Sequence, residues 1–238
     1  MVMNKVSRDN LAARVYANIK EALMQGRFTP GQRLKITDMA AQLGVSDTPV
    51  REAFMQLIRE RALVSSGLQS FFVPEASFDS FTEVREIRLL LEPLAATKAA
   101  LLITAPGIDT LEAAHRALID AERREDWRAA VYHNYEFHLG IARAAGAPSL
   151  LGILESLWLQ TGPALNLLYP HALPKYAETH QHDRLIECLR QRDAAGAGEA
   201  ARADIEEGGA SLVRLLKAID DGSITTPMLV EAAASRRA

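Results

Sequence analysis

Apolar residues recur at helical spacing along most of the chain. Near the N-terminus, Leu11, Val15, Ile19 and Leu23 form an i, i+4 stripe. This stripe predicts an amphipathic helix over residues 9–25 with one buried face. Similar patterns return repeatedly towards the C-terminus, so we expect a mostly helical protein.

The stretch TDMAAQLGVSDTPVREAFMQLIRER, from Thr37 to Arg61, indicates two short helices joined by a tight turn. Gly44 stands where the first helix ends, because glycine adopts the left-handed conformation there without a steric cost. Pro49 suits the first turn of the second helix, and Val50 and Phe54 begin its apolar face. This helix-turn-helix arrangement places its second helix in the DNA major groove, although hairpins of two helices without a DNA partner share it.

The residues after this hairpin favour two short strands around a turn. Residues 62–64 and 71–73 are mostly apolar, and a Ser-Ser-Gly sequence lies between them. Together with the preceding helices, these strands predict a winged helix-turn-helix domain over residues 1–74.

From residue 78 to 222 the apolar pattern is helical, with no convincing strand. Pro, Gly or polar residues interrupt it at 105–107, 124–125, 145–148, 169–170 and near Asp193. We therefore expect an all-α bundle of six or seven helices. A linker at residues 75–77 precedes it, and a tail at 223–238 forms a short helix or frays.

Composition and charge refine this picture without changing it. The 238 residues are 48% hydrophobic and 24% charged, and the single cysteine cannot form an internal disulfide. Residues 1–75 carry ten Lys and Arg against seven Asp and Glu, whereas residues 76–238 carry 17 against 23. A basic head on an acidic body suits phosphate contact at one end, although ordinary scatter also produces such a difference.

The polar N-terminus and the lack of a long apolar run predict a cytoplasmic protein without a membrane span.

Several segments carry a family resemblance. LAARVYANIKEALMQGRFTPGQRL and AAQLGVSDTPVREAFMQLIRERALV resemble the GntR family of bacterial transcription regulators, and TPVREAF is the most specific part of this match. EVREIRLLLEPLAATKAA, YEFHLGIARAAGAPSLLGILESLW and HQHDRLIECLRQRDAAGAGEAARADIEEG resemble the FCD effector domain of the FadR-type members. The resemblance implies a homodimer that binds a palindromic double-stranded DNA operator, with an effector in each bundle.

The resemblance places the DNA contacts on the second helix of the hairpin and on the wing. Arg51 lies on the outward-facing first turn of that helix, while Asp47 replaces an arginine of the usual S-R-T-P-V-R pattern. The Asp47 carboxylate can accept a hydrogen bond from cytosine N4, or it can simply be a cap of the helix that the helix dipole favours. For Arg33 and Lys35 a solvated position is the alternative to a phosphate contact. The expected DNA-binding residues are Arg33, Lys35, Thr37, Ser46, Asp47, Thr48, Arg51, Gln69 and Ser70.

The FCD resemblance also implies a divalent metal site inside the bundle. An Asp and three His commonly hold the metal there, and the matching residues are Asn134, His138, His182 and Asp204. Two imidazoles and a carboxylate suit zinc, nickel or manganese. Asn134 replaces the usual Asp and Asp204 the third His, which favours a more oxygen-tolerant metal. The alternative is that His138 and His182 are core histidines that donate to backbone carbonyls.

Arg88 and Arg85, on the first bundle helix, are the expected effector-binding residues. Arg88 matches a recurrent family position, and its guanidinium can clamp a carboxylate ligand. An ion pair with Glu92, four residues further on, is the alternative. We expect three further histidines to be solvated or at the rim of the pocket: His133, His171 and His180. We expect three aromatic residues to fill the core: Trp127, Trp158 and Phe137.

These observations predict a ligand-responsive transcription regulator, a repressor that senses a small organic or sugar acid through the metal. A regulator that binds its effector without a metal is the second interpretation. A metal-dependent enzyme in the bundle is the third. No general base stands at useful spacing, and the sequence contains no HExxH, GxSxG or Walker A motif, so we expect no catalytic residues.

Overall fold

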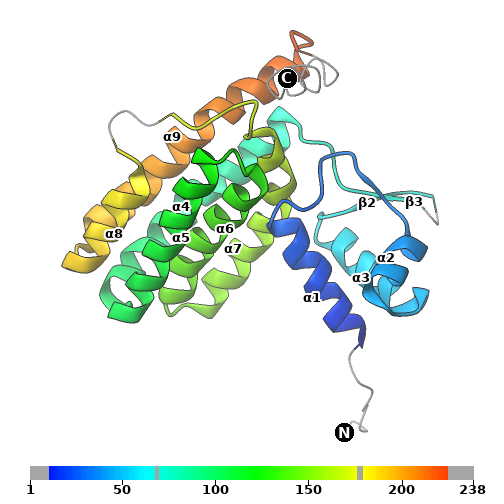
Figure 1. The fold of residues 1–238 in the computed structure, drawn as a ribbon, viewed down its shortest axis with the longest axis horizontal. Helices are drawn as coiled ribbons and strands as arrows, with labels where there is room; N and C mark the ends of the chain where they lie inside the picture. The colour runs from blue at the N-terminus through cyan, green and yellow to red at the C-terminus, as the bar shows by residue number, and fades with distance from the viewer. Residues whose placement is uncertain (1–10, 68–69, 176–178, 225–238) are drawn as a thin grey trace, which may run out of the picture.

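The computed structural model describes residues 11–67, 70–175 and 179–224. These residues form a small N-terminal head and a larger helical bundle, with α1 lying between them (Figure 1). Within the described ranges, no helix is both long and apolar enough to cross a membrane.

The head is a winged helix, as the sequence predicts. Its antiparallel sheet has the strand order β1-β3-β2, and Leu34 pairs with Phe71 while Ser66 pairs with Ser70. Residues 9 and 10, where the first predicted helix begins, lie outside the described residues. The bounds are α1 Leu11–Met24, β1 Arg33–Leu34, α2 Ile36–Leu43, α3 Asp47–Arg59, β2 Val64–Ser66 and β3 Ser70–Phe72.

The turn between α2 and α3 follows the local sequence closely. Gly44 ends α2 in the left-handed conformation, with a φ of 65°, which glycine adopts without a steric cost. Ser46 occupies the N-cap of α3, but its side chain makes no capping hydrogen bond. The Ser46 hydroxyl therefore stays on the surface.

The bundle contains six α-helices in its described part, the lower of the two numbers expected. Residues 105–107 open α5 rather than interrupt the chain, because the Thr104 side chain caps the helix by accepting from the Gly107 amide. The proline at position 106 fits there because the first turn leaves its amide groups unpaired anyway. The bounds are α4 Phe78–Leu102, α5 Ala105–Arg123, α6 Trp127–Ala144, α7 Pro148–Thr161, the 3-10 helix η1 Gly162–Leu167, α8 Gln181–Gln191 and α9 Ala194–Asp220.

Helices α4 and α9 approach each other closely through small residues. A Cβ added to Gly198 would lie only 2.7 Å from the Thr97 hydroxyl oxygen, and Ala96, Ala99 and Ala200 are fully buried in the same cluster. Close packing of this kind holds the polar side chains of both helices at fixed positions in the bundle interior.

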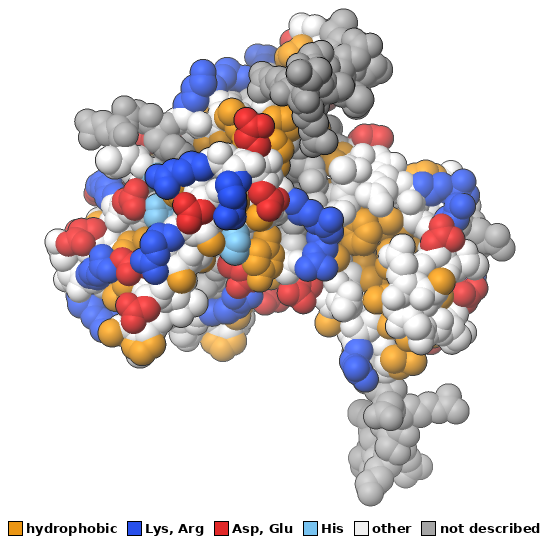
Figure 2. All heavy atoms as spheres, in the orientation of Figure 1, with side chains coloured by type: hydrophobic (Ala, Val, Ile, Leu, Met, Phe, Trp, Pro, Cys, Tyr) orange, Lys and Arg blue, Asp and Glu red, His pale blue; other side chains and the backbone are white. Residues whose placement is uncertain are grey.

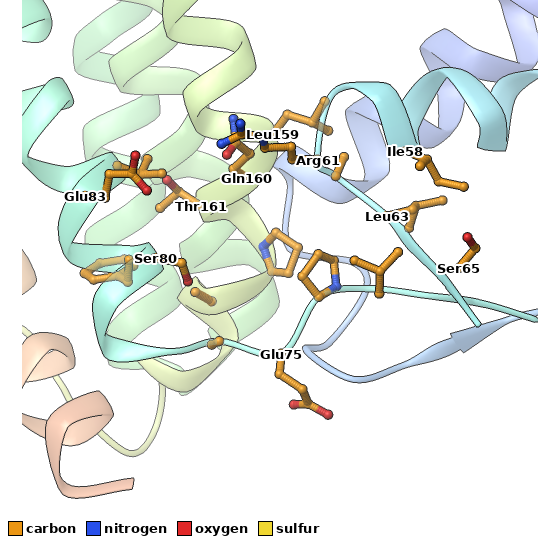
Figure 3. Close-up of a pocket in the computed structure, with 18 residues that line it drawn as sticks. Ile58, Arg61, Leu63, Ser65, Glu75, Ser80, Glu83, Leu159, Gln160 and Thr161 are labelled. Atoms are coloured by element: carbon orange, nitrogen blue, oxygen red, sulfur yellow. The ribbon is translucent and has the colours of Figure 1, made fainter. Parts of the chain in front are cut away.

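The head and the bundle share one hydrophobic core. Ile19 and Leu23 of α1 belong to the same buried cluster as Trp158 and Leu159 of α7. A cleft of about 550 Å³ remains between the two parts, lined by the end of the head around Leu63 and by α4 and α7 (Figure 3). Because α1 contacts α3 of the head as well as α7 and η1 of the bundle, it connects the two parts.

Candidate nucleic-acid interface and metal centre

The first turn of α3 presents its polar side chains to solvent. Ser46, Asp47, Thr48 and Arg51 are all exposed, while the opposite face of α3, which includes Phe54, is buried in the head. This is the placement that a recognition helix requires. Asp47 is the first residue of α3 and not its N-cap, so its carboxylate lies at the positive end of the helix dipole.

The other expected DNA contacts lie on β1, on the start of α2 and on the wing. The Arg33 guanidinium donates to the Ser70 hydroxyl at 3.2 Å, which brings these two predicted residues together. Lys35 and Thr37 are exposed beside Asp38, with the Lys35 ammonium 3.9 Å from its carboxylate. Gln69 lies outside the described residues.

Three of the four expected metal ligands meet inside the bundle. His138 comes from α6, His182 from the first turn of α8 and Asp204 from α9, and one ligand atom from each lies within 4.8 Å of the others. The His138 Nε2 atom is 3.2 Å from Asp204 Oδ2, and His182 Nε2 is 3.5 Å from Asp204 Oδ1. All three side chains are buried, and His182 is completely inaccessible.

Glu92 of α4 orients the His138 ring of this cluster from the side opposite to Asp204. Its carboxylate accepts from His138 Nδ1 at 2.9 Å, from the Trp158 indole at 3.1 Å and from Arg88 Nε at 2.6 Å. Since the carboxylate can only accept, Nδ1 of His138 carries the donated proton and Nε2 faces Asp204. A carboxylate behind a histidine is the usual support of a metal-binding imidazole.

Burial and charge act in opposite directions on these groups. Burial alone would raise the pKa of Glu92, but Arg88 and His138 outweigh it and lower that pKa to about 2. Burial alone would lower the pKa of His138, whereas Glu92 and Asp204 raise it to about 9. For His182 burial prevails over the attraction of Asp204 and lowers the pKa to about 4. His182 is therefore neutral near neutral pH, the form of the ring that can bind a metal, whereas His138 is protonated there and has to release its Nε2 proton when a metal binds.

The residues of the cluster fit a divalent cation. Both ring nitrogens of His182 and the Oδ1 atom of Asp204 are buried without a hydrogen-bond partner among the described residues. Unpaired buried polar atoms cost free energy, and a cation between them would satisfy the carboxylate oxygen and one nitrogen. The set of imidazole nitrogen and carboxylate oxygen atoms suits zinc, nickel or manganese.

Asn134 and the two predicted effector arginines line a small cavity next to this cluster. The cavity has a volume of about 50 Å³ and also contacts His138 and Asp204, which leaves room for an ion and a few ligand atoms. Arg88 forms the ion pair with Glu92 that we considered as the alternative, and its guanidinium carbon lies 4.2 Å from the centre of the Trp158 ring. Arg85 donates to the Ile205 and Glu206 carbonyls of α9.

The remaining expectations about histidines and aromatic residues hold in part. Phe137 and Trp158 are core residues, whereas Trp127 is half-buried and stacks on Tyr169 with the ring centres 5.4 Å apart. His133, His171 and His180 are half-buried.

His115 of α5 is a buried residue that the sequence analysis overlooked. It lies on the same helix face as Leu111 and Leu118, both of which are buried, so the apolar period could have indicated its inward position. Its ring centre lies 4.8 Å from that of His180 and 5.2 Å from that of His182.

A winged helix-turn-helix head with an exposed second helix, joined through a shared core to a helical bundle, is the architecture expected of a DNA-binding transcription regulator. Comparisons with known proteins agree. The family model of the bacterial regulatory proteins of the gntR family matches residues 11–73, and that of the FCD domain matches residues 83–207. The chain therefore belongs to the GntR family, in its FCD-containing, FadR-like group, whose members are regulators and not enzymes.

Similar proteins support the same assignment. The HTH-type transcriptional regulator McbR of Escherichia coli is 31% identical over 194 residues, which cover 81% of this chain and 88% of McbR. The solved McbR structure aligns with a TM-score of 0.79 over 89% of this chain and 99% of that one. A probable D-xylose utilization operon transcriptional repressor of Paenarthrobacter nicotinovorans is 26% identical, covering 79% of this chain and 83% of the relative.

Proposed function

We propose that the protein is a homodimeric repressor whose DNA binding responds to a small organic or sugar acid bound in the bundle. The observation that supports a sensor most directly is the buried set of His138, His182 and Asp204 beside a cavity. A buried polar cluster with unpaired atoms adds no stability to a bundle, so its presence there favours a binding function.

The cluster would hold a divalent metal through His138 Nε2, a nitrogen of His182 and the Asp204 carboxylate, with the Asn134 side chain at the edge of the cavity. Such an ion, when bound, supplies a positive centre that an anionic oxygen of the effector can approach. Arg88, which lines the cavity while paired with Glu92, orients the carboxylate of the effector. Arg85, three residues earlier on α4, lines the same cavity.

A regulator without a metal is the second candidate. Side chains alone make the continuous chain of contacts from Arg88 through Glu92 and His138 to Asp204. Metal analysis of full-length protein, purified without a His-tag or chelator, separates the two candidates. One tightly bound ion per chain that is lost in His138→Gln supports the first, and a metal-free protein that still responds to its effector supports the second.

The shared core offers a route from the cavity to the DNA. Trp158 contacts Glu92 and the Arg88 guanidinium in the bundle, and it lies in the same hydrophobic cluster as Ile19 and Leu23 of α1. An effector that favours one position of α7 therefore also favours one position of the head, which is the requirement for a ligand to change DNA affinity.

The assignment of the recognition helix can be tested by binding-site selection on random DNA, repeated with a panel of organic acids. We expect Arg51→Ala to weaken binding to the selected operator by about 1–3 kcal/mol and to relax its sequence preference. Arg59→Ala is the matched control, because Arg59 is an exposed arginine on the last turn of the same helix. An unchanged sequence preference in Arg51→Ala contradicts the assignment.

A further inference from the structure

A second group of imidazoles lies next to the His138, His182 and Asp204 cluster. His115 of α5, His180 at the N-cap of α8 and His182 each offer a ring nitrogen, and these three atoms lie within 4.8 Å of one another. The ring centres of His180 and His182 are 4.2 Å apart. Histidines from two helices therefore converge on one point.

His115 is oriented like a metal ligand. Its Nε2 atom lies 3.0 Å from the Asp183 carboxylate, which can only accept a hydrogen bond, so Nε2 carries the proton and Nδ1 carries the lone pair. That Nδ1 atom is buried and has no hydrogen-bond partner among the described residues. Asp183 thus accepts a hydrogen bond from one ring nitrogen of His115, as Glu92 does from His138. This arrangement supports a metal-binding imidazole, because it orients the ring and leaves the other nitrogen for the ion.

His182 is able to serve both groups. Its ring stacks on Phe137, with the ring centres 3.7 Å apart and the planes within 15°, so the orientation of the ring is fixed. Both of its nitrogens are buried and lack a hydrogen-bond partner in the described ranges. The Nε2 atom lies 3.5 Å from Asp204 Oδ1 of the first group, which leaves Nδ1 for the second.

We propose that His115, His180 and His182 form a second transition-metal site, bridged to the first site by the His182 ring. Each ion binds a different nitrogen of that ring, and the ring releases its remaining N–H proton to water as the second ion binds. A set of three imidazoles suits zinc, nickel or copper. His180 is only half-buried, so solvent supplies the fourth ligand.

This inference rests on the metal site of the proposed function, which supplies the other ion at the His182 ring, but it requires neither an effector nor DNA. The two sites share His182 alone. Asp204 and His138 belong only to the first site, and His115 and His180 only to the second. Variants of these residues therefore separate failure of one site from failure of the other.

The test is a zinc titration of the full-length, tag-free protein, with bound metal counted by native mass spectrometry. We expect two zinc ions per chain in the wild type and one in each of His115→Gln, His180→Asn and His138→Gln. Asparagine keeps an N-cap at position 180, where the histidine side chain accepts from the His182 amide, so that variant preserves the start of α8. His133→Gln, a half-buried histidine outside both groups, is the matched control and keeps two ions.

The cobalt-substituted protein gives a second readout. We expect the visible absorption bands of two cobalt ions in the wild type, and a change in the bands of the remaining ion in His115→Gln, because the bridging ring then keeps its proton. One ion per chain in the wild type, unchanged by His115→Gln and His180→Asn, overturns the second site while the first stands. An ion lost in His115→Gln but not in His138→Gln overturns the first site and supports the second.

Discussion

Glu92 connects more polar partners than any other buried residue in the described part of the bundle. It accepts from Arg88, His138 and Trp158, and both oxygens take part. Its carboxylate compensates the buried Arg88 charge and fixes the direction in which His138 points. The site therefore depends on a residue that is not itself a candidate ligand.

We expect Glu92→Gln to lower the free energy of unfolding by about 3 kcal/mol, because removal of one partner leaves the other charge buried without compensation. Urea denaturation of the ligand-free protein measures the change. The control is Glu83→Gln, an exposed carboxylate on the same helix, which should stay within about 0.5 kcal/mol of the wild type. Equal stability of the two variants would show that Arg88 finds another partner.

The neutral Asn134 leads to a prediction in the opposite direction. Asn134→Asp adds an anionic oxygen one helical turn before His138, at the cavity that His138 and Asp204 also line. We expect zinc affinity to rise about tenfold, which is about 1.4 kcal/mol, as measured by competition with a chromogenic chelator. Glu136→Gln, a half-buried carboxylate on the same helix but outside the cavity, should leave the affinity unchanged, and no gain in Asn134→Asp would remove Asn134 from the site.

The sequence could indicate single residues where a local pattern or a family motif specifies them. The outward position of Arg51 follows from the helical period, because the apolar positions of the same helix define its buried face and Arg51 is not among them. The pairings of Glu92 with His138 and of Asp183 with His115 join residues 46 and 68 positions apart. Such pairs depend on how the helices pack, which no local pattern records, and this is why His115 was overlooked.

At the level of elements, α1 and the start of η1 are in close backbone contact. A Cβ added to Gly162 would lie 2.4 Å from the Leu23 carbonyl oxygen and 2.9 Å from the Met24 Cα atom. Both are backbone atoms of α1, so only a shift of the whole helix could relieve the clash.

We therefore expect Gly162→Ala to destabilise the protein by about 1–3 kcal/mol, although alanine tolerates the helical backbone at this position. Gly152→Ala is the matched control, because a Cβ there meets nothing within 4 Å; it should stabilise α7 by about 0.5–1 kcal/mol. Thermal denaturation followed by circular dichroism compares them. Equal melting temperatures would contradict the tight contact.

The elements themselves were largely predictable, because glycine, proline and the apolar period mark most of their ends. Gly44 ends α2 where the sequence indicates. The exception is the start of α5, where the Ala-Pro-Gly sequence suggests a break but Thr104 caps a helix that includes it. Proline and glycine are compatible with both a turn and a first helical turn, so composition alone could not decide.

At the level of the whole molecule, one apolar stripe of α4 has no cover in the single chain. Ile87, Leu90, Leu94 and Leu101 are between 38% and 66% exposed, and their spacing places them along one side of the helix. A second copy of the chain, packed on the same stripe about a two-fold axis, would bury these residues. This surface supports the homodimer in our proposal.

We expect Leu94→Glu to weaken self-association by at least about a hundredfold, because it introduces like charges on both sides of the axis. Analytical ultracentrifugation measures the mass, and operator binding should fall with it because the two half-sites are no longer contacted together. Leu173→Glu, a substitution of a leucine that is 40% exposed and lies outside α4, is the control and should stay dimeric. A dimeric Leu94→Glu protein would place the interface elsewhere.

The core shared by head and bundle has a consequence for the exchange of parts between relatives. Ile19 and Leu23 of this head are buried in one cluster with Trp158 and Leu159 of this bundle, so a chimaera that joins the head to a foreign sensor domain would pack poorly where the two parts meet. Anyone grafting its operator specificity onto another regulator would have to transplant the matching face of α7 with it.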